Sequence, residues 1–142
     1  CVGQEVGNSD IEVCKAQAIA ARTNVYQYVL KNATATDSSS SSQAFSADRI
    51  DNQNYKNVTA AVEATAGVIL AYNNKPVSPA SFSASNGGKT TSSEERWGGV
   101  RAWLISKDDP YDYARTKGKK TGHGVGMSQV GAKEMAAQGF TY

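Results

Sequence analysis

Apolar and small residues recur at three- and four-residue steps along a stretch near the amino terminus. The stripe consists of Ile11, Cys14, Ala18, Ala21, Val25 and Tyr28. This spacing predicts a helix from about Ile11 to Leu30 with one apolar face. Ser9 and Glu12 fit a capping box at its start, in which each side chain satisfies a backbone N–H of the other. Because the stripe is rich in alanine, which lets neighbouring elements approach closely, we expect this helix to be central.

The remaining pattern predicts a second helix, several strands and a last helix. The second helix spans about Tyr55 to Ala66 and stops at Gly67, a typical residue for a left-handed C-terminal cap. Apolar runs and turn residues then predict a strand at 68–72, a turn at 73–76, a returning strand at 77–85, another strand at 101–105 and a turn at 108–110. Ser128 is the predicted cap of the last helix, which ends at Gly139.

A polar stretch from Asn32 to Asn54, with five consecutive serines, separates the two helices. We expect a long loop within one domain, because neither flank is long enough to fold alone. With 142 residues the chain suits one domain with one modest core. The predicted fold class is α+β: a single domain, residues 1–142, with a long N-terminal helix, a small mostly antiparallel sheet and long glycine-rich loops.

Charge and hydropathy narrow the class of protein. The net charge is +2 and the charges are interspersed, which is too weak for a nucleic-acid binder. The sequence has no apolar run of the length, about 18 residues, that a membrane span needs. Cys1 and Cys14 are consistent either with a disulfide in an extracytoplasmic protein or with two unrelated thiols.

The segment from Gly122 to Gln129 carries the first candidate chemistry. Its glycines at alternate positions permit unusual backbone angles and close contact with a ligand. His123, the single histidine of the chain, lies among them just before a predicted helix N-terminus, where backbone N–H groups are unsatisfied. The segment is either a ligand-binding loop or a tight glycine turn with an incidental histidine.

The segment from Ser83 to Gly88, followed by Glu94, Glu95 and Trp97, is the second candidate. Polar side chains at a strand end, a glycine turn, a carboxylate and an indole together are typical of a carbohydrate-binding surface. The alternative is a solvated loop with a core tryptophan.

Taken in order, these motifs resemble the SpoIID/LytB family, the lytic transglycosylases similar to stage II sporulation protein D together with related amidase enhancers. The resemblance covers nearly the whole chain. It is carried by Glu5 with 15–23 (KAQAIAART), 36–37 (TD) with 43–45 (QAF), 61–67 (AVEATAG), 85–90 (SNGGKT), 93–95 (SEE), 97–99 (WGG), 109–112 (DPYD) and 122–129 (GHGVGMSQ).

The resemblance implies an enzyme that cuts the bond between N-acetylmuramic acid and N-acetylglucosamine in peptidoglycan strands stripped of stem peptides, and leaves 1,6-anhydro ends. It assigns the catalytic role to Glu5, as general acid and then base. One carboxylate suffices, because the nucleophile is the sugar's own 6-hydroxyl, already held beside the reacting carbon. An ordinary glycosidase needs two carboxyl groups.

The substrate-binding residues that we expect are spread over the motifs, and the list includes no metal ligand and no cofactor. They are Lys15, Gln17, Arg22, Ser83, Ser85, Asn86, Gly87, Glu94, Trp97, His123, Gly124, Met127, Ser128 and Gln129. The expected partners are glycan strands and, less directly, a cell-wall amidase, in an extracytoplasmic location. Two alternatives stay open: a noncatalytic wall-binding amidase enhancer, and a structural partner in a sporulation or division complex.

The sequence departs from the family pattern around Glu5. Val6 and Gly7 stand where the family has methionine and proline. Family domains also have a strand before the glutamate and a helix after the last motif, so we expect a chain trimmed at both ends. Some relatives bind zinc through cysteine and histidine in the loop before the Thr-Asp motif. Residues 31–42 contain neither, which predicts no such zinc site.

Overall fold

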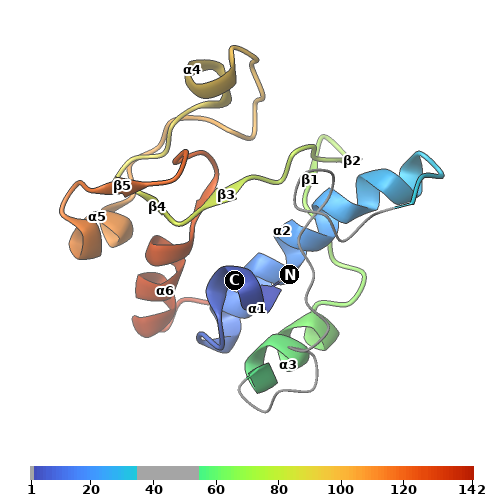
Figure 1. Cartoon of the computed structure of the whole chain (residues 1–142), viewed down its shortest axis with the longest axis horizontal. Coiled ribbons are helices and arrows are strands. Elements are labelled where there is room, and N and C mark those ends of the chain that lie inside the picture. The colour runs from blue at the N-terminus through green and yellow to red at the C-terminus, as the bar shows by residue number, and fades with distance from the viewer. Residues whose placement is uncertain (1, 35–54) are drawn as a thin grey trace. The chain divides into compact units, whose positions relative to one another are not determined.

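The computed structural model describes residues 2–34 and 55–142, and Figure 1 shows their helices and strands. The described residues fall into two compact units. The first contains the residues up to Ala80 together with Tyr142, and the second is Ser81–Thr141. Helices and short strands occur in both units, which confirms the α+β class. Cys1, and with it the disulfide question, lies outside the described residues, as do the Thr-Asp motif and most of the expected long loop.

The described residues of the first unit form three helices and a short hairpin: α1 Val2–Val6, α2 Ile11–Leu30, α3 Lys56–Ala64, β1 Ala71–Tyr72 and β2 Lys75–Pro76. The bounds of α2 are those predicted. Consecutive residues from Gln17 to Ala21 are all buried, whereas Val29 and Leu30 at the end of α2 are 61% and 53% exposed. The middle of the helix is therefore enclosed, which agrees with the central position expected from its alanines.

The predicted capping box of α2 is wrong. The cap is Asp10, whose Oδ1 accepts the Glu12 N–H at 2.9 Å. The Ser9 hydroxyl instead donates to the Val6 carbonyl at the end of α1. The Glu12 side chain accepts from Lys15 Nζ at 2.7 Å rather than reaching back to the cap.

The hairpin is tighter than predicted. Asn73 and Asn74 both have positive φ, 50° and 61°, which is the geometry of a two-residue type I′ turn. Lys75 and Pro76 are therefore paired residues, opposite Tyr72 and Ala71. The predicted returning strand at 77–85 does not form as one element. Its last part becomes β3 Phe82–Ser83 and the start of β4 Ser85–Asn86.

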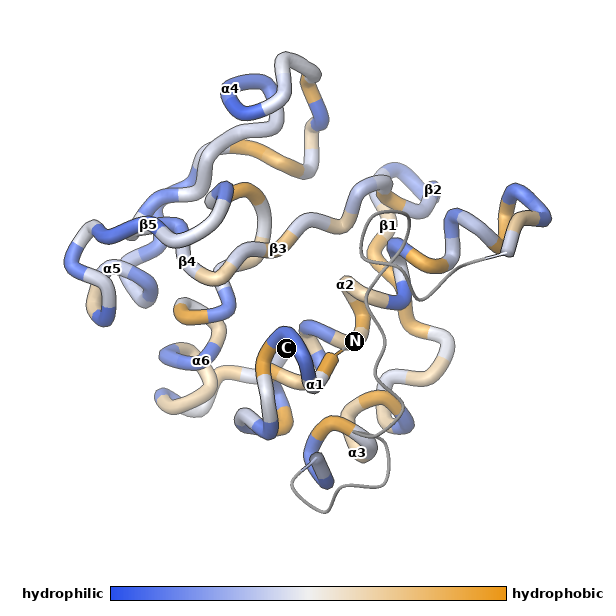
Figure 2. Tube along the Cα trace, in the orientation of Figure 1, coloured by the Kyte–Doolittle hydropathy of each residue, from blue (hydrophilic) through white to orange (hydrophobic). Residues whose placement is uncertain are grey.

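Short strand ladders and three helices make up the second unit. The helices are α4 Ser93–Trp97, α5 Pro110–Thr116 and α6 Gln129–Ala137, and the remaining strands are β5 Lys120–Thr121 and β6 Met127–Ser128. β3 pairs with β6 in parallel and β4 pairs with β5 antiparallel. In Figure 2, α5 and β5 are coloured as largely hydrophilic, whereas α3 of the first unit is mostly hydrophobic.

Two predictions for the second unit are corrected and one is confirmed. Residues 101–105 form a turn and not a strand, because the Leu104 N–H donates to the Arg101 carbonyl at 2.9 Å. The expected turn at 108–110 is the start of α5, with Asp109 as its cap. The last helix begins and ends as predicted: Ser128 Oγ accepts the Gly131 N–H at 2.9 Å, and Gly139 follows α6 with a φ of 85°.

No helix within residues 2–34 and 55–142 combines the length and the apolar character that crossing a lipid bilayer requires.

Candidate functional site

The two glycine-containing segments singled out in the sequence lie side by side in the second unit. Ser83 is opposite Ser128 in the parallel ladder, and Ser85 is opposite Thr121 in the antiparallel one. Because β5 and β6 pair with one continuous stretch in opposite directions, the chain must reverse between them, at residues 122–126. The pattern of glycines at that reversal is therefore a requirement of the backbone as well as a candidate ligand loop.

Gly126 is the position where the backbone tolerates no side chain. Its φ is 77°, and a Cβ there would overlap the carbonyl oxygen of Ser81. The Met127 N–H donates to the same carbonyl at 3.1 Å, so the two chains are held at backbone distance. Gly124 is buried beside them, and its carbonyl accepts the Thr91 N–H at 2.9 Å.

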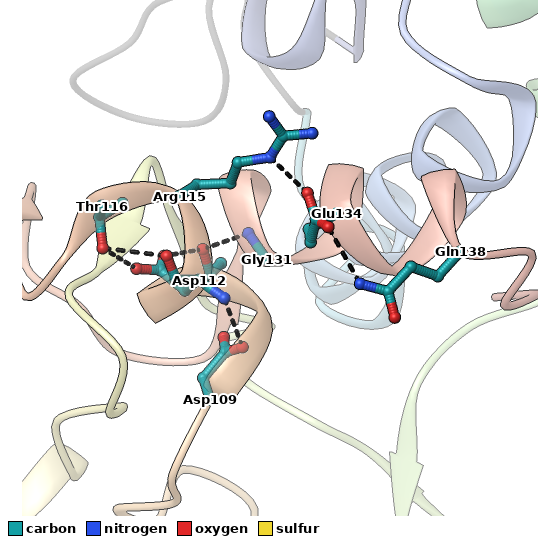
Figure 3. Close-up of polar contacts among 8 residues, drawn as sticks. Asp109, Asp112, Arg115, Thr116, Gly131, Glu134 and Gln138 are labelled. Carbon is teal, nitrogen blue, oxygen red and sulfur yellow. Dashed lines mark hydrogen bonds and ion pairs between the residues drawn. The ribbon is translucent and has the colours of Figure 1, made fainter.

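A buried carboxylate, Asp112 in α5, joins these segments. It is 0% exposed. Its Oδ1 accepts from Ser85 Oγ at 3.0 Å and from Thr116 Oγ1 at 2.8 Å. Its Oδ2 accepts the Asn86 N–H at 3.0 Å and the hydroxyl of Ser128. Figure 3 shows how Asp112 lies between Thr116 and the start of α6.

The hydrogen bonds keep Asp112 ionised. Burial alone would raise the pKa of this carboxyl, but the donors Ser128, the Asn86 backbone, Thr116 and Ser85 outweigh it, so the pKa lies below its ordinary value. A buried charge is stable only when it is paired or well hydrogen-bonded. Asp112 is therefore the structural centre of this polar cluster.

Asn86 continues the cluster toward Asp109. Its Nδ2 donates to Asp109 Oδ2 at 2.7 Å, and its Oδ1 accepts the Gly88 N–H at 2.8 Å. Asp109 lies against Gly131 of α6, where an added Cβ would stand 2.7 Å from Asp109 Oδ2. The polar atoms of Ser85 and Asn86 are thus bonded within the protein. These two predicted substrate-binding residues shape the glycine turn at Gly87.

His123 and Trp97 form the part of the second unit best suited to contact a ligand. Their ring centroids are 5.4 Å apart with an interplanar angle of 53°, and Trp97 is 46% exposed. His123 Nδ1 accepts the Val125 N–H at 3.0 Å. Partial burial lowers the pKa of His123, and the nearby positive charge of Arg96 lowers it further. A hydrogen bond with the Phe82 backbone acts in the opposite direction but does not cancel this shift. The imidazole is consequently neutral near pH 7.

The other predicted residues of the second unit differ in accessibility. Glu94 is exposed on α4, and Met127 is half-buried. Ser83 and Gln129 are buried, at 6% and 8% exposure. The buried Ser83 Oγ has no hydrogen-bond partner within the part of the chain that the structure describes.

Glu5, the predicted catalytic residue, belongs to the first unit. Val2 and Val6, four residues apart on α1, are buried, and Gly3 lies against the Tyr55 ring, where an added Cβ would be 2.7 Å away. These contacts fix one face of the helix. Glu5 lies on the same helix at an exposed position. Gly7, which replaces the proline of the family pattern, ends α1 with a φ of 63°.

The three substrate-binding residues predicted in the first unit are bonded to other residues of that unit or buried in it. They are Arg22, Lys15 and Gln17. The Arg22 guanidinium donates to the carbonyls of Thr65 at 2.7 Å, Val68 at 3.0 Å and Val62 at 3.1 Å, and so caps the end of α3. Lys15 pairs with Glu12 and lies over the Tyr142 ring, 5.1 Å from its centroid. Gln17 is 0% exposed.

Two features were missed in the sequence. Asp112 was recognised as part of a motif but given no role. Its one signal is an acidic residue in the first turn of a helix that opens with Asp-Pro. A cavity beside the C-terminal half of α2 has no signal in the sequence, because its walls are distant in the chain.

Comparison with known proteins identifies the family. The family model "SpoIID: Stage II sporulation protein" matches residues 1–72, which is half of the chain and includes Glu5 and all of α2. The chain belongs to the SpoIID family. This confirms the resemblance inferred from the motifs.

Named relatives within and around the SpoIID family agree. The chain is 34% identical to stage II sporulation protein D of Bacillus amyloliquefaciens over 116 residues, 71% of this chain and 33% of that protein. It is 31% identical to the protein of the same name from Bacillus subtilis (strain 168) over 125 residues, 78% of this chain and 36% of the relative. It is 34% identical to an amidase enhancer of Bacillus subtilis (strain 168) over 102 residues, 72% of this chain and 13% of that protein. The matches thus span about a third of the two sporulation proteins and less of the enhancer.

Proposed function

We propose that this chain is the catalytic core of an extracytoplasmic peptidoglycan lytic transglycosylase that acts in cell-wall remodelling. The observation that carries the proposal is the family match over residues 1–72, which includes Glu5 and the helix that follows it. Glu5 lies on α1 at an exposed position beside the buried residues Val2 and Val6, so its carboxyl group is accessible to a glycan strand.

The chemistry proposed for Glu5 is one proton cycle. Its carboxylic acid donates a proton to the oxygen that bridges N-acetylmuramic acid and N-acetylglucosamine, and the bond from that oxygen to the anomeric carbon breaks. The 6-hydroxyl of the same muramic acid attacks the anomeric carbon and closes the 1,6-anhydro ring. Glu5, now a carboxylate, accepts the hydroxyl proton and returns to its starting state. No water is consumed and no cofactor is needed.

The second unit would contribute glycan contacts. The indole of Trp97, held at an angle by His123, offers an apolar face of the kind on which sugar rings stack. Glu94, which is exposed on α4, is the remaining candidate there for hydroxyl and acetamido groups. The supporting role that burial favours is assigned to Ser83, Ser85, Asn86, Ser128 and Gln129.

Digestion of peptide-free glycan strands tests this function. Wild-type protein should release products with 1,6-anhydro ends, identified by mass spectrometry, and Glu5→Gln should lower the rate at least about 100-fold. Glu63→Gln, which removes an exposed carboxylate from α3, is the matched control and should retain full activity. Hydrated reducing ends would mean a hydrolase, and equal rates for wild type and Glu5→Gln would refute the role of Glu5.

The similarity to an amidase enhancer favours one alternative function, a noncatalytic wall-binding module. Such a module would produce no anhydro ends, would bind strands equally well with Glu5→Gln, and would raise the rate of a cell-wall amidase added to the same strands.

A further inference from the structure

A cavity of about 360 Å³ lies beside the C-terminal half of α2, within the first unit. Its walls come from α2 and from the segment that follows the β1–β2 hairpin. The lining residues are Asn24, Val25, Gln27, Tyr28, Lys31, Ser78 and Pro79. Its volume falls within the range of about 300–1,000 Å³ that is typical of small-molecule sites.

The cavity is already formed in the absence of a ligand, because two amides of α2 hold its second wall. Asn24 Nδ2 donates to the Ala80 carbonyl at 2.9 Å, and Asn24 Oδ1 accepts the Ala80 N–H at 2.8 Å. Gln27 Nε2 donates to the Val77 carbonyl at 3.3 Å. The segment that carries Ser78 and Pro79 is thus fastened to the helix on both sides. A ligand would not have to bear the entropic cost of ordering it.

The lining defines the chemistry of the ligand. Val25, Tyr28 and Pro79 offer apolar and aromatic surface, and Lys31 is the one charged residue among the lining residues that the structure describes. Lys31 is exposed, and no carboxylate within residues 2–34 and 55–142 pairs with it. A fitting ligand has an apolar ring face, a small methyl-bearing group and at most one negative charge. An N-acetylated amino sugar with a carboxylate meets all three conditions, whereas a polyanion or a fatty acyl chain does not.

Helix geometry places this cavity away from Glu5. Cys14, in the first turns of α2, contacts the end of α1 through the Gly7 carbonyl. The cavity begins at Asn24, ten residues further along α2, which at about 1.5 Å per residue is roughly 15 Å along the axis. A glycan strand whose reacting bond lies at Glu5 would therefore reach the cavity with a different sugar unit.

We propose that this cavity is a distal subsite that binds an N-acetylmuramic acid unit of the glycan strand, with its carboxylate on Lys31 and its ring on Tyr28. The inference rests on the proposed function for its biological ligand. Holding a strand at two places raises the effective concentration of the second contact, so the subsite would favour long strands over short ones.

Amide NMR titration tests the subsite directly. With Glu5→Gln protein, peptide-free strands of alternating N-acetylglucosamine and N-acetylmuramic acid should shift the amide signals of residues 24–31 and of Val77, Ser78 and Ala80. Lys31→Ala should weaken this binding at least fivefold, while binding of chitotetraose, which has no carboxylate, should be unchanged. Lys56→Ala, an exposed lysine of α3, is the matched control and should bind both probes as wild type does.

The outcomes separate this inference from the proposed function. Tyr28→Ala should weaken the binding of both probes, and circular dichroism verifies that this variant is folded. If it does not fold, the amide signals that shift in the Glu5→Gln protein and the binding by Lys31→Ala still test the subsite. Anhydro products from wild type without shifts at residues 24–31, or unaltered binding by Lys31→Ala, would overturn the subsite alone. Shifts at the cavity without any strand cleavage would overturn the transglycosylase alone.

Discussion

Replacement of Asp112 by asparagine is the sharpest test of the polar cluster in the second unit. The carboxylate is 0% exposed and accepts four hydrogen bonds, two on each oxygen. A hydrogen bond to a charged group contributes about 1.5–3 kcal/mol, and one between neutral groups about 0.5–1.5 kcal/mol. Asparagine therefore weakens each bond by about 1 kcal/mol and offers only one acceptor oxygen.

The two hydroxyl donors on Oδ1 limit the damage. If the amide nitrogen takes that position, Ser85 and Thr116 can rotate their hydroxyls and accept instead. The amide oxygen then still serves the Asn86 N–H. We expect Asp112→Asn to lower the free energy of unfolding by about 2–4 kcal/mol. Asp112→Ala leaves the Asn86 N–H without an acceptor and should cost more.

Urea unfolding monitored by tryptophan fluorescence measures this loss. Both tryptophans of the chain, Trp97 and Trp103, lie in the second unit, so the signal reports on that unit. Asp108→Asn is the matched control. The Asp108 side chain is 87% exposed and 3.9 Å from Lys89, and its loss should change stability by less than about 0.5 kcal/mol.

The pH dependence adds an independent check. Because the folded-state pKa of Asp112 is lowered, its contribution is fully present above the unfolded value of 3.8 and is lost as the pH falls through the folded-state pKa. The difference in the free energy of unfolding between wild type and Asp112→Asn should stay constant from pH 7 to about 5 and become smaller only in stronger acid. A variant within about 0.5 kcal/mol of wild type at pH 7 would refute the central role of Asp112.

Three further substitutions test other contacts. Gly126→Ala should destabilise the protein by more than about 3 kcal/mol through overlap with a backbone carbonyl, whereas Gly139→Ala, with a φ of 85° and open space around it, should cost about 1–2 kcal/mol; urea midpoints compare the two. Arg22→Ala should remove about 2 kcal/mol and speed amide exchange at the end of α3, and normal exchange there would contradict its capping role. The pKa of His123 is lowered mainly by burial and also by Arg96. As the pH drops, the unfolded chain therefore binds a proton on this histidine at a higher pH than the folded chain does, and the free energy of unfolding should fall as the pH drops through 6.5. Arg96→Gln should raise that pKa in an NMR titration of the imidazole, and an unchanged value would exclude the charge effect.

Local signals in the sequence were enough to predict the long helices. α2 has the predicted bounds, and Ser128 caps α6 as predicted, because periodicity and capping act within a few residues. The start of α2 shows the limit of such signals. Ser9 and Asp10 are both good caps, and the choice between them depends on the Val6 carbonyl, which takes the Ser9 hydroxyl.

Contacts between distant residues account for most of what the sequence analysis missed. Residues 101–105 contain apolar residues in a strand-like run, but a turn bonded to Ser93 forms instead. Arg22 has the spacing of a surface charge, and only the position of α3 turns it into a cap. The Asn86 turn and the His123 loop were both recognised as motifs, but only the pairing of β3 with β6 and of β4 with β5 shows that they lie side by side.

The ladders of the second unit have a consequence for how the chain acquires its structure. Ser81 donates a hydrogen bond to the Val125 carbonyl, 44 residues away in the sequence, and Ser85 donates one to the Lys119 carbonyl, 34 residues away. The strands β3 and β4 therefore have no partners until the last quarter of the chain is available. Closing loops of this length costs conformational entropy before the contacts that stabilise them have formed. We expect the helices of the first unit to appear early in refolding and the second unit to follow in one slower, cooperative step.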